Sequence, residues 1–502
     1  MFEASIFLFT CCLLAVTAQT QYSPTGPQQA EDIPLSDRQF RVVYEWRTVD
    51  FAYKTEAERG SARQQGKFID KNVLISDIKA FANRLYFTMP RMLPGVPATL
   101  GWVIAPDNNG RSDPLIEPFP SWELNAEGDC FALQFVQGIA IDADGVLWAV
   151  DSGRLNTLEQ PDNTFSCPPK IILFDLKNNG TELQRYEFPD GVVMRRANYL
   201  NKIVVDDADG GYAYITDNSQ SDPGIVVYSR KLNQSWKVRD DRSMRADQNA
   251  MMFTVNGTNL RFSIHIDGIA LGPYYNPQTG ESSSVPYNPR MTNENYERNV
   301  YFSPLSSYHL FSIPASMLRN PRSSTLQSPN YDIIDHGLKS SQTDGMIMDN
   351  RGILYYGLLK DHAIAQWDSY QPFTPNNQHI IAKDDHFIQW TDGMTFDERG
   401  YLYVVINRLH NFVARRLNPN EVNFRVLRAK TGGMSYVFTN NGPGAGNVGI
   451  NLLPQDGNFP GGISSTPSAF NSYDPNRSGA SSRNIFTILN LLFIGIVVHL
   501  LR

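Results

Sequence analysis

One short phrase recurs along the chain. It reads TDGMIMDNRG from Thr343 and TDGMTFDERG from Thr391, and the same plan returns in QGIAIDADGVLWAVDSG from Gln137 and NKIVVDDADGGYAYITDNS from Asn201. Each copy has a short apolar run, an Asp-x-x-Gly turn and a second run rich in Tyr, Trp, Val and Ile. Such a pattern predicts a β-hairpin, because Asp caps the turn and Gly accepts a positive φ angle.

The aspartates of these turns have two interpretations. We favour turn capping over calcium binding, because an EF-hand loop needs further ligands and a closing Glu that these segments lack. The residues concerned are Asp142, Asp144, Asp206, Asp349 and Asp397. No metal site is predicted from them.

Weaker copies of the phrase complete a series of six. The units start near residues 77, 137, 201, 267, 344 and 392, a period of about 50 to 75 residues with almost no helical periodicity. Third strands such as KIILFDL from Lys170 and AIAQWDS from Ala363 follow the hairpins. We therefore expect an all-β fold, a six-bladed β-propeller over residues 40–438. Either the strand from Phe40 or the one from Glu421 would complete a blade begun at the other end of the chain.

The start of the chain has the features of a secreted protein. Residues 1–18 form an apolar run ending in a small-residue cleavage pattern, which predicts a signal peptide followed by a linker over 19–39. Its removal leaves Cys130 and Cys167, which we expect to form a disulfide instead of staying as free buried thiols. The Asn-x-Ser/Thr sequons predict glycosylation at Asn179, Asn233, Asn256 and Asn476.

The end of the chain suggests membrane attachment. Residues 439–484 are rich in Gly, Asn, Ser and Pro and predict a flexible tail, and residues 485–502 are mostly apolar. The small residues Ser478, Gly479 and Ala480 favour a glycolipid-anchor signal, with a membrane helix or a soluble secreted form as alternatives. The net charge of −7, without a basic face, excludes nucleic acid as a predicted partner.

Several segments resemble the yellow and major royal jelly protein family of insects. They are EWRTVDFAY from Glu45, TMPRMLPGVPATLGWV from Thr88, AIAQWD from Ala363 and PNEVNFRVL from Pro419, and the resemblance runs from about Phe40 to Ala429. It implies a secreted six-bladed propeller with a role in cuticle pigmentation, in conversion of dopachrome during melanin synthesis, or in binding of biogenic amines in the central channel. Gln366 stands where many relatives have Cys, so a second disulfide of the family is absent.

The first strand of each propeller blade lines the central channel. Tautomerising or decarboxylating an aminochrome needs a base and donors to the quinone oxygens. We interpret His265, Asp267 and Asp392 as catalytic candidates. The ligand-binding candidates are Thr343, Asp344, Thr391, Lys360 and Tyr355.

Other interpretations of the same residues stay open. A catecholamine or indoleamine binder would use Asp267, Asp344 and Asp392 for the ammonium group and the aromatic walls Tyr86, Tyr355 or Trp148 for the ring. The aspartates would instead tie blades together, hold Ca²⁺ in a hydrolase, or belong to a structural cuticle or cell-surface factor without catalysis. No cofactor is expected, because the sequence lacks a Gly-rich phosphate loop, a Gly-x-Ser-x-Gly elbow and a His-Glu-x-x-His motif.

Overall fold

The computed structural model describes residues 32–33, 40–106, 113–159, 166–275, 296–322 and 331–438. All of them belong to the first of two compact units of the chain, residues 1–446. The predicted signal peptide (1–18), the tail (439–484) and the apolar segment 485–502 lie outside the described residues, so these three assignments stay predictions.

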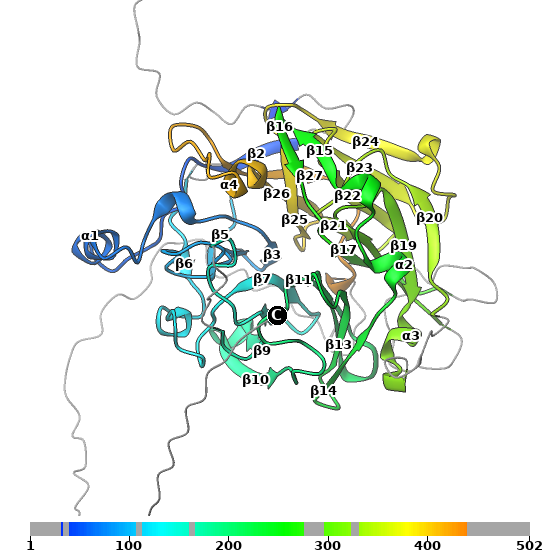
Figure 1. The fold of residues 1–502 in the computed structure, drawn as a ribbon, viewed down its shortest axis with the longest axis horizontal. Coiled ribbons are helices and arrows are strands. Elements are labelled where there is room, and N and C mark those ends of the chain that lie inside the picture. The colour runs from blue at the N-terminus through cyan, green and yellow to red at the C-terminus, as the bar shows by residue number, and fades with distance from the viewer. Residues whose placement is uncertain are drawn as a thin grey trace, which may run out of the picture. The chain divides into compact units, whose positions relative to one another are not determined.

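The described chain forms a six-bladed β-propeller, as the repeat predicts (Figure 1). Each blade is a sheet of antiparallel strands, named here from the channel outward. The first three blades comprise β3 (Ile78–Phe81), β4 (Arg84–Thr88), β5 (Leu100–Ile104) and β6 (Glu117–Pro118); β7 (Val136–Ile141), β8 (Val146–Asp151), β9 (Lys170–Asp175) and β10 (Thr181–Glu187); and β11 (Leu200–Asp206), β12 (Tyr212–Asp217), β13 (Gly224–Ser229) and β14 (Gln234–Val238).

The remaining three blades follow the same plan. They comprise β17 (Ile266–Leu271), β18 (Asn299–Pro304), β19 (His309–Pro314) and β20 (Ile334–Leu338); β21 (Met346–Met348), β22 (Ile353–Leu358), β23 (Ala363–Asp368) and β24 (Gln378–Lys383); and β25 (Trp390–Phe396), β26 (Tyr401–Asn407), β27 (Phe424–Lys430) and β2 (Phe40–Trp46). The six innermost strands begin where the six repeat units were placed, and each contacts the innermost strand of the next blade around the ring.

The ring is closed by the beginning of the chain. Strand β2 pairs antiparallel with β27, with Trp46 opposite Phe424, so the last blade takes its outer strand from residues far back in the sequence. The two-residue strand β1 (Asp32–Ile33) pairs outside β2. This closure protects edges that an open sheet would expose, and it makes the fold depend on contacts between both ends of the propeller.

The hairpin turns have the chemistry that the sequence predicts. Asp349 Oδ1 accepts hydrogen bonds from the backbone N–H groups of Arg351 (2.9 Å) and Ile353 (3.0 Å), and Asp397 Oδ1 accepts equivalent bonds from Arg399 and Tyr401, both 2.9 Å long. Asp142 caps its turn in the same way. The turn-capping interpretation is confirmed for these three residues.

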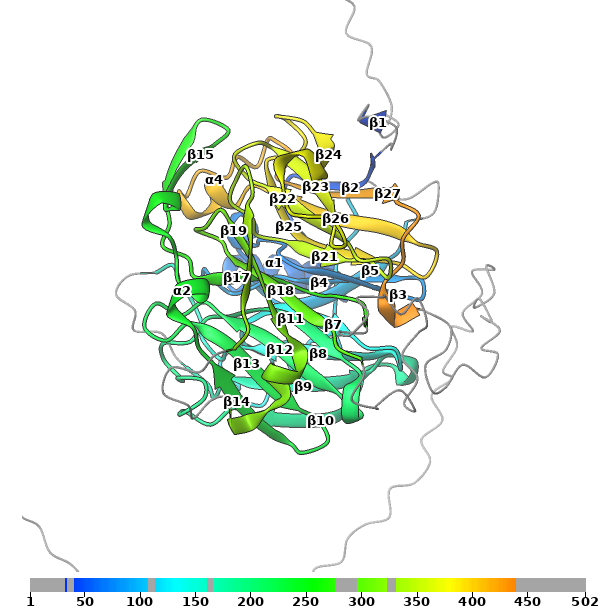
Figure 2. The same ribbon diagram turned by 90° about the vertical axis from the view of Figure 1, so that its right-hand side faces the viewer.

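Segments outside the blades are short. The α-helices of the described residues are α1 (Glu56–Gln64), α2 (Asp241–Met244), α3 (Ala315–Arg319) and α4 (Leu409–Val413) (Figure 1). A separate hairpin, β15 (Met252–Val255) with β16 (Thr258–Arg261), comes between the third and fourth blades in sequence, and β15 is labelled in both views (Figure 1 and Figure 2). None of the helices in the described ranges has the length and apolar character needed to cross a membrane.

The predicted disulfide is confirmed between Cys130 and Cys167, whose Cα atoms are 5.2 Å apart. The three sequon asparagines within the described ranges share one placement. Asn179, Asn233 and Asn256 are exposed, and each has a positive φ of 43° to 51° in the turn of a strand hairpin. A turn that projects from the sheet leaves such a side chain accessible to modification.

Trp46 provides a test of ring closure. Its side chain is 2% exposed, packs against Phe87 with ring centroids 6.0 Å apart, and donates from Nε1 to the carbonyl oxygen of Pro114 (2.9 Å). We expect Trp46→Ala to lower the free energy of unfolding by about 3–5 kcal/mol, measured by chemical denaturation. Arg47→Ala, at an exposed neighbouring position, is the control and should change it by less than about 0.5 kcal/mol. Equal effects of the two variants would contradict the role of β2 as the closing strand.

The turn asparagines predict three N-linked glycans on the propeller. After secretion from insect cells, peptide-N-glycosidase treatment should reduce the mass of the protein, and Asn→Gln changes at Asn179, Asn233 and Asn256 should each remove one glycan. Mass spectrometry of the glycopeptides checks this. Unmodified peptides at all three positions would contradict the prediction.

A candidate site in the central channel

Charged side chains and one asparagine from five blades meet where the innermost strands begin. We call them the channel cluster: Asp77, Lys79, Asn201, Lys202, Asp267, Asp344 and Asp392. Each member lies at or beside the start of an innermost strand, because the repeat gives each blade the same register relative to the channel. The exposed fraction of the four aspartates is only 2–5%. The cluster is thus buried inside the protein.

Lys202 is the centre of this cluster. Its Nζ contacts the carboxylate of Asp392 and lies 3.7 Å from Asp344 Oδ1, and its side chain is 9% exposed. Burial opposes the charged ammonium form, but the carboxylates of Asp392 and Asp344 outweigh burial and raise the pKa of Lys202. The ammonium group therefore stays charged and joins the third, fifth and sixth blades.

The carboxylates also have neutral partners on neighbouring strands. Asp392 accepts a hydrogen bond from Asn407 Nδ2 (2.9 Å), Asp344 accepts one from Trp390 Nε1 (2.8 Å), and Asp267 accepts one from Asn201 Nδ2. The bonds of Asp344 and Asp267 cross between adjacent blades. These aspartates therefore tie blades together, which is one of the roles that the sequence leaves open.

Protonation in the cluster is set by burial and by repulsion. Burial and the neighbouring Asp344 raise the pKa of Asp267 well above its ordinary value, and the same two causes raise the pKa of Asp392 to about 7. Several carboxyls that share one lysine cannot all ionise at low cost. The cluster consequently holds exchangeable protons near neutral pH.

A second ion pair lies beside the first. Lys79 Nζ is 2.8 Å from Asp77 Oδ1 and 3.0 Å from the carbonyl oxygen of Ile78, while Asp77 Oδ2 accepts from the backbone N–H of Ile139 (3.2 Å). Burial lowers the pKa of Lys79, against the opposing effect of Asp77. The Lys79 ammonium group consequently releases its proton more readily than that of an exposed lysine.

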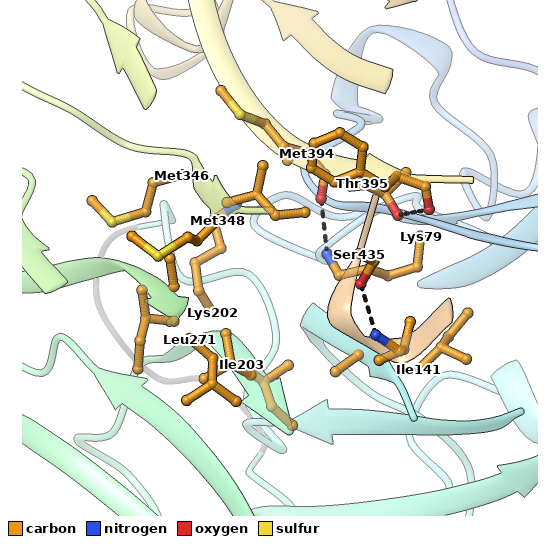
Figure 3. A pocket seen from close by; sticks show the side chains of 18 of the residues that line it. Lys79, Ile141, Lys202, Ile203, Leu271, Met346, Met348, Met394, Thr395 and Ser435 are labelled. Atoms are coloured by element: carbon orange, nitrogen blue, oxygen red, sulfur yellow. Dashed lines mark hydrogen bonds between the residues drawn. The ribbon is translucent and has the colours of Figure 1, made fainter. Parts of the chain in front are cut away.

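A cavity of ≈ 80 Å³ extends along the channel from these ion pairs (Figure 3). Asp77, Lys79 and Lys202 line it together with Ser435 and the short 3-10 helix Tyr436–Phe438, which follows β27. Its other walls are largely apolar side chains of the innermost strands, among them Ile141, Leu271, Met346, Met348 and Met394. The cavity thus combines titratable groups with apolar and methionine walls.

The structure brings together only part of the candidate set. Asp267, Asp344 and Asp392 meet in the channel cluster. His265 does not join them: its Nδ1 accepts a hydrogen bond from the backbone N–H of Ala246 (2.8 Å). Burial lowers the pKa of the His265 imidazole. His265 is thus a buried, neutral histidine bound to a neighbouring loop.

The other predicted ligand groups lie elsewhere in the blades. Thr343 Oγ1 donates to the carbonyl oxygen of Gly357 (2.8 Å), and Thr391 packs against the same glycine. Lys360 is exposed, and Tyr355 is fully buried between blades, with its ring beside Phe396. Among the described residues, the lining of the cavity includes none of these four.

The proposed aromatic walls are core residues. Tyr86 packs against Phe119, and Trp148 donates from Nε1 to Asp142 (2.9 Å). Within the described ranges, no three His, Cys, Asp or Glu side chains are placed to hold a metal ion. The ammonium group of Lys202 occupies the space between Asp344 and Asp392 that a bound cation would take.

Sequence reasoning missed Asp77, Lys79 and Lys202 as site residues. A signal was present, because Asp77 begins the DIKAF copy of the repeat at the position that Asp344 and Asp392 take in theirs. Lys202 interrupts an otherwise apolar innermost strand in NKIVVDD. A charge at such a position must find a partner in the channel.

Fold and site define an all-β propeller with a buried cavity and ion pairs in its channel. The chain belongs to the major royal jelly protein family, whose model matches residues 134–435. Dopaminechrome tautomerase of Drosophila melanogaster is 31% identical over 411 residues, which cover 78% of this chain and 82% of the relative. Protein yellow of the same species is 29% identical over 394 residues, 77% of this chain and 68% of the relative.

Similarity to solved structures is lower. A gluconolactonase from Xanthomonas campestris is 12% identical with a TM-score of 0.40, and the alignment covers 82% of this chain and 99% of that chain.

Lys202→Met tests the central role of this ammonium group. In this variant Asp392 and Asp344 stay buried without their cation. We therefore expect the free energy of unfolding to fall by about 3–5 kcal/mol at pH 8. In the folded protein Asp392 keeps its proton to a higher pH than in the unfolded chain, because its pKa is raised to about 7. Its contribution to the free energy of unfolding is therefore fully present in acid and falls as the pH rises from about 4 toward 7. The loss caused by Lys202→Met should therefore be smaller at pH 5 than at pH 8.

Denaturation curves of both proteins at the two pH values measure this difference. Lys360→Met is the matched control, because this lysine is exposed, and its effect should stay within about 0.5 kcal/mol at either pH. A loss for Lys202→Met that does not depend on pH would show that its charge is not what stabilises the cluster.

Proposed function

We propose that this is an extracellular protein of melanin pigmentation that converts an aminochrome, such as dopachrome or dopaminechrome, by tautomerisation in its channel cavity. The observation that carries the proposal is the placement of Asp77, Lys79 and Lys202 at one end of a cavity with apolar walls. The similarity to dopaminechrome tautomerase and to protein yellow supports this choice of substrate class.

The reaction needs a base and an acid but no electron acceptor. A base removes a proton from a carbon of the five-membered ring, the electron pair moves into the ring system, and a quinone oxygen gains a proton. Asp77 would accept the carbon-bound proton. The ammonium group of Lys79 or Lys202 would donate to the quinone oxygen, and Asp392 and Asp267 would hold the protons that restore the starting state.

The cavity is larger than a water site, and its walls suit an aromatic ligand. A volume of ≈ 80 Å³ is several times the roughly 10–15 Å³ that one water molecule needs. The thioethers of Met346, Met348 and Met394 give a polarizable surface on which an aromatic ring packs favourably. His265 has no place in this mechanism, because its ring is bound to the Ala246 loop.

The site favours a quinone over an amine ligand. An amine binder would direct an ammonium group at Asp344 and Asp392, but the ammonium group of Lys202 already contacts these two side chains. A second cation at the same place would be repelled. Lysines at the end of the cavity are instead suited to oxygen atoms that gain negative charge during the reaction.

An extracellular location has independent support. The Cys130–Cys167 disulfide is typical of an oxidising compartment, and the exposed turn asparagines are suited to N-glycosylation. We propose further that the apolar segment 485–502 attaches the protein to the cell surface. Release from intact cells by a phosphatidylinositol-specific phospholipase would distinguish a glycolipid anchor from a membrane helix.

The activity is tested with purified protein and freshly prepared dopaminechrome and dopachrome. Loss of the visible absorbance is followed for the wild type, Asp77→Asn, Lys79→Met and the surface control Lys360→Met. We expect the two cavity variants to lose about a hundredfold or more in rate, as removal of a general acid or base does, and the control to match the wild type. A wild-type rate equal to the protein-free rate for both compounds would refute the proposal.

A further inference from the structure

The end of the cavity that faces away from the channel cluster is covered by one segment of the chain. We call residues Thr431–Phe438 the strap. It follows β27 in the last blade, and Ser435 to Phe438 contribute to the cavity lining (Figure 3). The opposite end is closed by the buried ion pairs of the channel cluster, whose aspartates are 2–5% exposed. The cavity is thus bounded by a charged cluster at one end and by the strap at the other.

The strap crosses from one side of the channel to the other. Met434 pairs with the turn of the fifth blade, where Asn350 N–H donates to the carbonyl oxygen of Met434 (2.9 Å) and Asn350 Oδ1 accepts from Met434 N–H (3.1 Å). Two residues later, Tyr436 Oη donates to the carbonyl oxygen of Val205 in the third blade (2.6 Å). The guanidinium of Arg298, beside the fourth blade, lies 4.9 Å from the centre of the Tyr436 ring.

The attachment of the strap differs from that of a blade strand. Residues 434–438 are only half-buried, whereas most residues of the innermost strands are fully buried. Gly432, which is exposed and has a φ of +81°, lies near the start of the strap, and Gly433 beside it is buried against the Asp349 carboxylate. An exposed glycine with a positive φ angle, next to a half-buried segment, allows the backbone rotation that a hinge needs.

The methionines that line the cavity are shielded from solvent. Met346, Met348 and Met394 line the cavity, and they are 8%, 1% and 3% exposed. A ligand that packs against these thioethers therefore needs more of their surface exposed than this arrangement gives.

We propose that the strap is a lid of the channel cavity, which opens about Gly432 and is held closed by Tyr436. Opening would expose the methionine walls and the ion pairs behind them to ligands from solution. This inference goes beyond the proposed reaction, because it concerns access to the cavity whatever molecule enters.

Methionine oxidation tests the lid without any substrate. Hydrogen peroxide transfers one oxygen atom to a thioether and leaves water, and the sulfoxide at each position is measured by peptide mass spectrometry on the full chain. The variant is Tyr436→Ala, which removes the bond to Val205 and the contact with Arg298. The matched control is Tyr370→Ala, at a position that is 45% exposed.

The same protein contains reference methionines. Met252 is 70% exposed and should be oxidised quickly in all variants, and Met89 and Met244 lie in the core at 0% exposure, away from the cavity lining. We expect Tyr436→Ala to speed oxidation of the three cavity methionines by about tenfold, as loss of one hydrogen bond and one cation–π contact allows. Met89 and Met244 should stay protected, and Tyr370→Ala should match the wild type.

Three outcomes would overturn the proposal. In the first, Tyr436→Ala leaves the cavity methionines as protected as in the wild type. In the second, Met89 and Met244 become reactive together with them, which means that Tyr436 supports the whole fold and not a lid. In the third, the cavity methionines of the wild type react as fast as Met252, which means that the strap does not exclude the reagent.

Discussion

The channel depends on one buried ammonium group, that of Lys202, which compensates the negative charge of the aspartates around it. Four aspartates from four blades converge where the innermost strands begin, and their mutual repulsion in a buried site would force the blades apart or force the carboxyls to bind protons. Lys202 supplies the compensating charge from a fifth blade. The ion pairs of Lys202 thus hold the ring together. The groups that remain available to a ligand are those of the cluster that line the cavity, Asp77, Lys79 and Lys202.

Ring closure and cavity access both come from the ends of the propeller chain. Strand β2 completes the last blade, and the strap that follows β27 in that same blade lines one end of the cavity. The segment that finishes the architecture is thus continuous with the segment proposed to control entry. The last blade, whose strands β2 and β27 are farthest apart in the sequence, is therefore directly connected to the strap that is proposed to move.

The fold was readable from sequence to an unusual degree, because the repeat encodes it locally. Asp349 and Asp397 cap turns as their Asp-x-x-Gly pattern predicts, and each innermost strand begins where a repeat unit was placed. The site was readable only in part. Asp267, Asp344 and Asp392 do converge, but His265 turns to the Ala246 loop, and spacing along one strand does not reveal what a side chain meets from another blade.

The sequence by itself determined the all-β propeller, the two candidate strands for closing its ring, the cysteine pair and the aspartates at the channel. These follow from local turn chemistry, period and composition. Only the tertiary structure decided that Lys202 is the partner of Asp392, that Asp77 and Lys79 face the cavity, and that residues 431–438 cross its end. Those contacts join blades that are far apart in the chain, and their geometry is set by how six twisted sheets pack around one axis.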